Sequence, residues 1–428
     1  MRNLTRTGAT FAVCLCLSPV VSCAQNSGPD KATRARMEAF ARGHSQALDL
    51  SSPEAFDPNL LDISAAQIFM LGEAHGMPVN NDLDLALLAW LHRAAGVRVY
   101  LCEFGHATAF LINRYFATGD EQLLDRFFSA VRGTQIWNRE YRDFFVRFRR
   151  WNAALPEDDG IRLVGLDIEH NPTFAVWALG EWVRESRAAG REPGVDIAGF
   201  ATRLAAIGTR IESPEASALA REAPDDFAAH RSAWSGLLGS LLADFEIVTA
   251  NLRQRNSAYA ARQDGNFNQI RDRAMYETFL KLYPTLHGAR CYGRWGSAHI
   301  AQAPIESTRW IATYLNEPDS PVAGKVLSIW PFYENSQTLS PAGDGRYRVR
   351  NVSESLPPPG LSSFAGPVTL VRLAGESSPF AAFPFMGRNL GEVAQYAVVI
   401  RGATAAHPLE ASAMDVPPMH GSPGRPRR

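Results

Sequence analysis

A carboxylate and an imidazole stand directly after a short apolar run in the first third of this sequence. Residues 68–71 are followed by Glu73 and His75 within the stretch FMLGEAHG. A run of consecutive apolar residues is typical of a buried strand, whose interior has no use for either polar group. Side chains of these two types transfer protons or bind metal ions. The stretch therefore indicates a functional site at the end of a strand.

Three later apolar runs end in the same kinds of residue. Residues 97–102 precede Glu103 and His106, residues 161–166 precede Asp167, Glu169 and His170, and residues 289–295 precede Ser297 and His299. Because ligand sites in open parallel sheets lie outside the carboxyl ends of the strands, we expect these groups to converge on one crevice. Any one of them alone would more often cap a loop, whereas carboxylates buried together need cations, shared protons or a metal ion.

The pattern between these runs is that of an α/β fold. Leucines recur at helical spacing in residues 82–93, and aromatic side chains share one helical face in residues 139–151. Strands alternating with helices predict a mainly parallel central sheet with helices on both sides. The predicted strands are residues 68–71, 97–102, 161–165, 289–292, 326–330, 368–371 and 396–400.

One long part of the chain offers helices without strands. Residues from about 174 to 286 contain helical patterns at 227–251 and 266–282 and no convincing strand. This predicts a large helical insertion packed over one end of the sheet. We expect a single domain over residues 35–401, followed by a disordered tail over 402–428 that is rich in Pro, Gly, Ala and Ser.

The first 23 residues have the features of an export signal. Arg2 and Arg6 precede an apolar run at 9–21, which is short of the roughly 20 residues that a membrane-spanning helix needs. The sequence VVSC at 20–23 resembles a bacterial lipobox, which predicts lipidation of Cys23 and a tether over 24–34. Ordinary cleavage after Ala24 is the alternative. We expect an exported, periplasmic protein that a lipid anchor holds on a membrane.

The anchor leads to a direct prediction. Cys23→Ala removes the thiol that would carry the lipid, so the variant should leave the membrane fraction. Fractionation of cells that express the wild-type protein and the variant measures this change. Equal membrane-bound fractions of the two proteins would contradict the anchor.

Composition and cysteine content exclude several classes of protein. The hydrophobic share of 46% and formal net charge of -1 are typical of a soluble globular domain and give no basic surface for nucleic acid. We therefore expect a small-molecule partner. Beyond the signal, Cys102 and Cys291 lie in or beside apolar runs, which predicts two buried thiols, and the chain has no Cys-x-x-Cys pair for a metal site.

Taken together, the motifs resemble a known family. Residues 68–400 are similar to the erythromycin-esterase-like proteins, within a superfamily that includes the haem-uptake protein ChaN and the Tiki-type peptidases. The single residue between Glu73 and His75 is closer to the ChaN and Tiki relatives, because the esterases usually have two. The motifs are LGEAHG, YLCEFG, INRYFATGD, IWNREYRDFFVRFRRWN leading to RLVGLD, RDRAM, GSAHI and YAVVIRGAT.

The resemblance implies an ester or lactone hydrolase that needs no cofactor. In this reading His75 is the general base that activates water, and Glu73 or Glu103 orients it. His299 would bind or protonate the departing oxygen, and Arg271 would hold the substrate or the developing oxyanion. The remaining strand-end groups are predicted to contact the substrate: Asp167, His106, His170 and Ser297. The chain has no Gly-x-Ser-x-Gly elbow, which argues against a serine acyl-enzyme.

The same residues also support an alternative. His75, His299 and either Glu73 or Glu103 would make a ligand set for a divalent ion with one position left for water, as in a Tiki-like metallopeptidase. An imidazole-bearing cleft on a lipoprotein would also bind haem, as in the ChaN relatives. The chain has no Cys-x-x-Cys-His attachment sequence, so such a haem would be noncovalent.

Overall fold

The computed structural model describes residues 30–208, 213–343, 345–352, 355–361, 366–375 and 377–414. The predicted signal with Cys23 lies outside the described residues, as does the end of the predicted tail from residue 415. Among the described residues, no helix is both long and apolar enough to cross a membrane.

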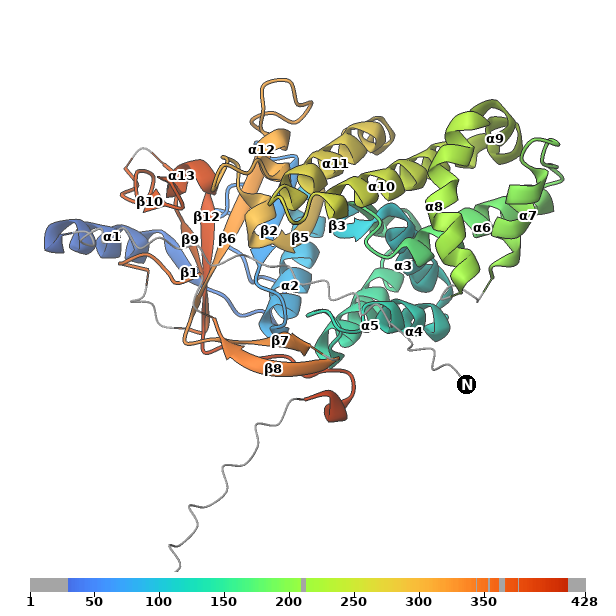
Figure 1. Cartoon of the computed structure of the whole chain (residues 1–428). Coiled ribbons are helices and arrows are strands. Elements are labelled where there is room, and N and C mark those ends of the chain that lie inside the picture. Colours follow the sequence, from blue (N-terminus) through green and yellow to red (C-terminus); the bar gives the residue numbers. More distant parts are fainter. Residues whose placement is uncertain are drawn as a thin grey trace, which may run out of the picture.

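A mixed, mainly parallel sheet forms the centre of the protein (Figure 1). Strand β9 runs antiparallel to both of its neighbours, and the six strands from β12 to β4 are parallel. The prediction of an α/β fold is confirmed, and each predicted strand is present. In spatial order the strands are β1 (Ser45–Ala47), β9 (Val368–Arg372), β12 (Tyr396–Arg401), β6 (Val326–Glu334), β2 (Ile68–Glu73), β5 (Cys291–Gly296), β3 (Val99–Gly105) and β4 (Arg162–Asp167).

Helices cover both faces of the sheet, because successive strand residues point to opposite sides. Phe69 and Leu71 of β2 belong to the core under α2 to α6, whereas Ile68 and Met70 belong to the core under α1, α11, α12 and α13. The helices named here are α1 (Lys31–Gly43), α2 (Pro78–Ala95), α3 (His106–Thr118), α4 (Glu121–Ala130), α5 (Arg139–Ala153), α6 (Pro172–Ala188), α11 (Phe267–Leu282), α12 (Ile311–Leu315) and α13 (Leu390–Val393).

The helical insertion begins with α6 and extends to one side of the sheet, with α7 to α9 farthest from it (Figure 1). The predicted helical stretch 227–251 is not one helix. It is divided at His230 and again at Gly239, where a φ of 57° ends the helical conformation. The remaining elements are α7 (Ala198–Ala206), α8 (Pro214–Ala229), α9 (Arg231–Leu238), α10 (Leu242–Ala260) and the 3-10 turns η2 (Gly239–Leu241) and η3 (Tyr283–Leu286).

Two predicted flexible segments are partly ordered. The predicted tether at 24–34 runs into α1, whose first turn is capped by Asp30. The prediction of a disordered tail from residue 402 is wrong for 402–414, because Ala405 and Ala406 are buried and the carbonyl of His407 accepts from the amide of Arg139 at 2.9 Å. This segment packs as irregular backbone, so it shows no apolar period in the sequence.

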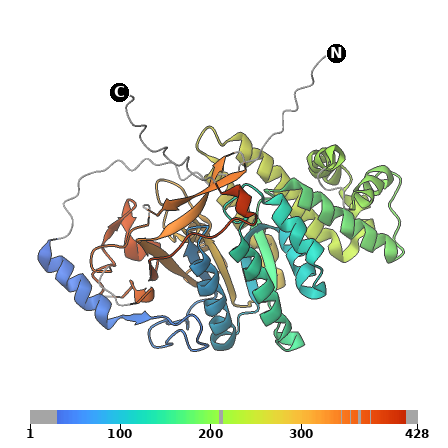
Figure 2. The ribbon, with the colours of Figure 1, turned by 90° about the horizontal axis from the view of Figure 1, so that it is seen from below.

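The segment 402–414 lies beside the hairpin of β7 (Gln337–Gly343) and β8 (Arg346–Asn351), as Figure 2 shows. Both features were missed in the sequence. The remaining short elements are β10 (Pro384–Phe385), β11 (Arg388–Asn389), η1 (Glu157–Asp159), η4 (Ser297–Ile300) and η5 (Ala411–Ala413).

Candidate functional site

The predicted convergence of strand-end groups is confirmed at Gly296, the last residue of β5. A Cβ atom at this glycine would lie 3.5 Å from His299 Cδ2, 3.6 Å from Glu103 Oε2 and 3.7 Å from His75 Nε2. These side chains come from the ends of three parallel strands or the turns that follow them. The missing side chain of Gly296 therefore leaves a small space that the predicted acid and base groups surround.

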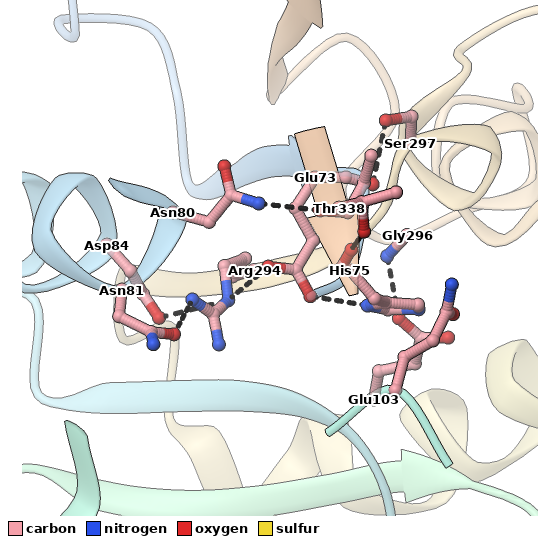
Figure 3. A network of polar contacts seen from close by, with 12 residues as sticks. Glu73, His75, Asn80, Asn81, Asp84, Glu103, Arg294, Gly296, Ser297 and Thr338 are labelled. Carbon is pink, nitrogen blue, oxygen red and sulfur yellow. Dashed lines mark hydrogen bonds and ion pairs between the residues drawn. The ribbon is translucent and has the colours of Figure 1, made fainter. Parts of the chain in front are cut away.

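The imidazole of His75 is held by a carboxylate. Its Nδ1 lies 2.6 Å from Glu73 Oε1, and the second oxygen of Glu73 lies 3.1 Å from Arg294 Nε (Figure 3). Burial is the largest influence on the pKa of His75 and lowers it, but the Glu73 and Glu103 carboxylates together outweigh burial, so the pKa of His75 is raised. Burial opposes ionisation of Glu73 as well, yet Arg294 and His75 lower its pKa. Because Nδ1 faces Glu73, Nε2 is the nitrogen that faces Gly296.

The loop that carries His75 is fastened through Gly76. Its φ of 82° is in the left-handed region, and a Cβ there would lie 2.5 Å from the carbonyl oxygen of Leu339. The carbonyl of Gly76 accepts from the amides of Leu339 at 3.0 Å and Ala406 at 2.9 Å. Only glycine fits this close approach. The hairpin and the C-terminal segment thus fix the position of the imidazole.

Glu103 reaches the site because β3 is irregular at this point. The register between β3 and β4 shifts between Cys102 and Gly105, and such a bulge redirects a side chain. Glu103 Oε1 lies 2.7 Å from Arg271 Nη2, and Oε2 accepts from the amide of Gly296 at 2.6 Å. Burial raises the pKa of Glu103, but the opposite effect of His299 and Arg271 is larger. This pKa therefore lies well below its usual range.

Arg271 is the buried cation of the cluster. It extends from α11, and its Nε and Nη2 donate to the two oxygens of Asp167 at 3.0 Å and 2.5 Å. Burial would lower the pKa of Arg271, but Asp167 and Glu103 raise it. The side chain is 3% exposed, and its Nε and Nη2 donate to carboxylates, whereas Nη1 lies next to His299. The guanidinium therefore neutralises Asp167 and Glu103 from beneath the site.

A second imidazole–carboxylate pair lies on the other side of Glu103. His299 Nδ1 lies 2.7 Å from Asp272 Oδ1, which also accepts from the amide of Ile311. His299 Nε2 lies 3.3 Å from Glu103 Oε1. Burial works against the charged ring, but Asp272 and Glu103 raise the pKa of His299 to about 9. His299 is thus a cation near neutral pH, and it is 2% exposed.

The other predicted substrate contacts differ in their placement. Ser297 lies in the cluster, but its hydroxyl donates to the carbonyl of Glu73 at 2.9 Å. His170 binds Asp167 Oδ2 at 3.0 Å through Nε2 and lies next to Tyr259. His106 is turned away and binds Asp244 on α10 at 2.8 Å. The structure therefore gives His106 a place in the scaffold that joins α3 to the insertion.

Sequence reasoning missed four polar residues of the network. Asp272 stands beside Arg271 in the RDRAM motif, and Arg294 is a charged residue in the middle of the buried strand β5. A buried charge of this kind is a signal in itself, because it requires a partner. The missed residues are Asp272, Arg294, Asp84 and Asn81.

The predicted metal ligands do not fit a metal ion in this arrangement. Arg271 Nη1 lies 3.1 Å from His299 Nε2, and Arg271 Nη2 lies 2.7 Å from Glu103 Oε1. The guanidinium therefore occupies Glu103 Oε1, and the protonated ring of His299 has no lone pair to offer a metal ion. Across the described ranges, no three His, Cys, Asp or Glu side chains form a group that could hold a metal ion.

Comparison with known proteins finds similarity in structure. No family model matches the chain, and no curated protein matches it. A protein from Bacillus cereus has a TM-score of 0.66 at 16% identity, covering 89% of this chain and 100% of that one. A succinoglycan biosynthesis protein has a TM-score of 0.64 at 14% identity, with 89% and 100% covered.

A third solved structure is a mutant of the erythromycin esterase EreC in its open conformation. Its TM-score is 0.59 at 15% identity, and the match covers 86% of this chain and 99% of that chain. Since all of these identities are low, the likeness concerns the fold. The chain described here has the fold of the erythromycin esterase EreC over most of the length of both proteins.

Proposed function

We propose that the protein hydrolyses an ester or lactone of a small molecule with water activated by His75. The observation that carries this proposal is the orientation of the imidazole. Glu73 holds Nδ1 at 2.6 Å, so Nε2 faces the space at Gly296 beside Glu103 and His299. A base held by a carboxylate through one nitrogen, with its second nitrogen directed elsewhere, is the arrangement that general-base catalysis requires.

The reaction follows from this geometry. Neutral His75 takes a proton from water at Nε2 while the water oxygen attacks the carbonyl carbon. The carbon–oxygen bond to the alcohol then breaks, and the departing oxygen takes the proton back from Nε2. Glu73 stabilises the intervening imidazolium. Proton transfer by a positioned side chain contributes ~10²- to 10⁴-fold in rate.

Arg271 and His299 are more deeply buried than Glu103. The side chain of Glu103 is 11% exposed, whereas those of Arg271 and His299 are 3% and 2% exposed. We therefore assign Arg271 and His299 to positioning Glu103 and to placing positive charge near the carbonyl oxygen as negative charge develops there. This changes the roles expected for them, which were direct contacts with the substrate.

Two further observations support hydrolysis by water. The hydroxyl of Ser297 is engaged by the carbonyl of Glu73, so it is not poised as a nucleophile. The fold is shared with an erythromycin esterase, which supports the hydrolase class and makes a macrolide lactone one substrate to test. A metal-dependent route has no such support, because Arg271 occupies Glu103 Oε1 and the His299 ring is protonated.

The test is hydrolysis of a panel of aryl esters, alkyl esters and lactones, including a macrolide, by the purified protein. We expect at least one member of the panel to release its acid, which mass spectrometry detects. Incorporation of one oxygen from labelled water into the acid, without a covalent acyl-enzyme, is the expected route. Absence of hydrolysis across the panel, or accumulation of an acyl-enzyme, would overturn the proposal.

The raised pKa of His75 predicts the pH dependence. The neutral ring is the base, so kcat/KM should rise with pH as His75 loses its proton. Glu73 is the main group that raises this pKa, so Glu73→Gln should move this limb to lower pH and also lower its plateau. The measurement is kcat/KM against pH for both proteins.

The matched control for this experiment is Asp226→Asn. Asp226 also pairs with an imidazole, that of His230, at 3.5 Å, but in the outer helices of the insertion. Its pH profile should coincide with that of the wild-type protein. A limb that stays in place in Glu73→Gln would show that His75 is not the titrating base.

A further inference from the structure

We propose that Arg294, anchored by Asp84, is a positioning residue that turns the carboxylate of Glu73 toward His75. The inference rests on the proposed function, in which His75 is the base. It assigns a role to a network beneath the site that the proposed reaction does not itself require. Figure 3 shows the network running from Asp84 and Asn81 through Arg294 to Glu73 and His75.

Arg294 binds three polar side chains. Its Nε lies 3.1 Å from Glu73 Oε2 and 3.3 Å from Asp84 Oδ2, and its Nη1 donates to Asn81 Oδ1 at 2.7 Å. The rings of Tyr141 and Phe144 enclose the guanidinium, with centroids 5.3 Å and 5.0 Å from Cζ. The side chain is 3% exposed. These contacts hold the planar guanidinium in one orientation.

Asp84 is itself immobilised. Its two oxygens each accept a hydrogen bond of 2.8 Å, from the hydroxyls of Tyr100 and Tyr292. Asp84 belongs to α2, and the tyrosines belong to β3 and β5. The carboxylate cannot rotate without breaking both bonds. The anchor of Arg294 is therefore built from three elements of the fold.

These contacts fix which oxygen of Glu73 faces His75. Arg294 takes Oε2, which leaves Oε1 for His75 Nδ1 at 2.6 Å. Burial disfavours the ionised carboxylate, but Arg294 is the main group that keeps the pKa of Glu73 low. Without Arg294, Glu73 would retain His75 as its cation and would lose its fixed orientation. A salt bridge that served stability alone would have no effect on the imidazole.

The experiment compares Arg294→Gln and Arg294→Lys with the control Arg98→Gln, which breaks an ion pair with Asp159 away from the site. Arg294→Gln should lower kcat about 10- to 100-fold with little change in KM, as is typical when a partner that orients a functional imidazole is lost. Arg294→Lys keeps the charge without the planar fork and should restore part of kcat. The double variant Asp84→Asn with Arg294→Gln removes one charge of each sign, so it tests the inference should the single variant not fold.

A second measurement needs no substrate. Glu73 raises the pKa of His75, so if Arg294 holds Glu73 toward the ring, NMR titration of labelled histidines should show a lower pKa of His75 in Arg294→Gln. A higher value would mean that only the repulsion from Arg294 is lost while Glu73 still faces the ring, and it would overturn the positioning role. A folded variant with an unchanged His75 titration overturns the positioning role. Wild-type kcat and an unchanged pH profile in Arg294→Gln would do the same.

The two measurements separate the inference from the function on which it rests. If the wild-type protein hydrolyses no ester, the proposed reaction fails, and the His75 titration still decides the role of Arg294. If the wild-type protein is active and Arg294→Gln matches it in both measurements, only the positioning role fails.

Discussion

His75→Ala is expected to lower kcat/KM for an ester or lactone about 10²- to 10⁴-fold, the range that a positioned proton-transfer group contributes. The imidazole is the group whose free nitrogen faces the space at Gly296. Its side chain is 14% exposed, so substrate and water can reach it. Stability should change little, because the ring lies at the edge of the site. Steady-state kinetics on any substrate from the panel measures the effect.

The matched control is His230→Ala. His230 is also paired with a carboxylate, that of Asp226 at 3.5 Å, but it lies in the outer helices of the insertion, outside the network of the site. This variant should retain wild-type kcat/KM. A loss of kcat/KM of less than about tenfold in His75→Ala would be smaller than any general-base contribution, and it would show that His75 is not the base.

Arg271→Gln is expected to have the largest effect on stability. Removing one partner of a buried ion pair leaves the other charge uncompensated, which costs about 3–5 kcal/mol in the free energy of unfolding. Arg271 has two such partners, because Asp167 is fully buried and Glu103 is 11% exposed. Urea denaturation at neutral pH measures the change. The pair broken by Arg98→Gln, whose side chains are 32% and 41% exposed, is the control, with an expected loss of about 1 kcal/mol.

The sign of the pH dependence follows from the two carboxylates. Asp167 and Glu103 have lowered pKa values in the folded protein, so their contribution is present above the unfolded carboxyl pKa of ~4 and is lost as the pH falls below it. The wild-type protein should therefore lose stability in acid. Arg271→Gln should lose less on the same change of pH, because Arg271 no longer contributes to lowering the pKa values of these carboxylates.

A compensating variant makes this prediction specific. Asp167→Asn with Arg271→Gln removes a buried charge of each sign, and it should regain part of the stability lost in Arg271→Gln. If the stability loss of the double variant equalled the sum of the losses of Asp167→Asn and Arg271→Gln, the two residues would not interact as their 2.5 Å contact indicates.

The sequence by itself determined the strands and the residues at their ends. Each of these features depends on neighbours within a few positions, since a buried strand is a short apolar run and its end is the first polar residue after it. Glu73, Glu103, Asp167 and His299 could therefore be assigned to one edge of a parallel sheet before their contacts were seen. The two buried thiols, Cys102 and Cys291, followed from the same local pattern.

Packing between distant segments lies beyond local patterns. The ordered residues 402–414 have no apolar period, and they are held by bonds to Gly76 and Arg139 far earlier in the chain. His106 follows a strand as His75 does, yet its ring turns to Asp244 of the insertion. Position in the sequence did not distinguish the two histidines, because the difference lies in which element each ring meets.

The tertiary structure alone decided the partners of each charged group. Arg271 binds Asp167 across 104 positions, and Arg294 joins Glu73 to Asp84 through the pairing of β5 with β2 and the packing of α2. A carboxylate pairs with whichever cation the register and packing bring within about 3 Å, because charge has no preference for sequence separation. For this reason the sequence indicated which residues could act, whereas the fold determined that Glu73 faces His75 and that Arg271 lies beneath Glu103.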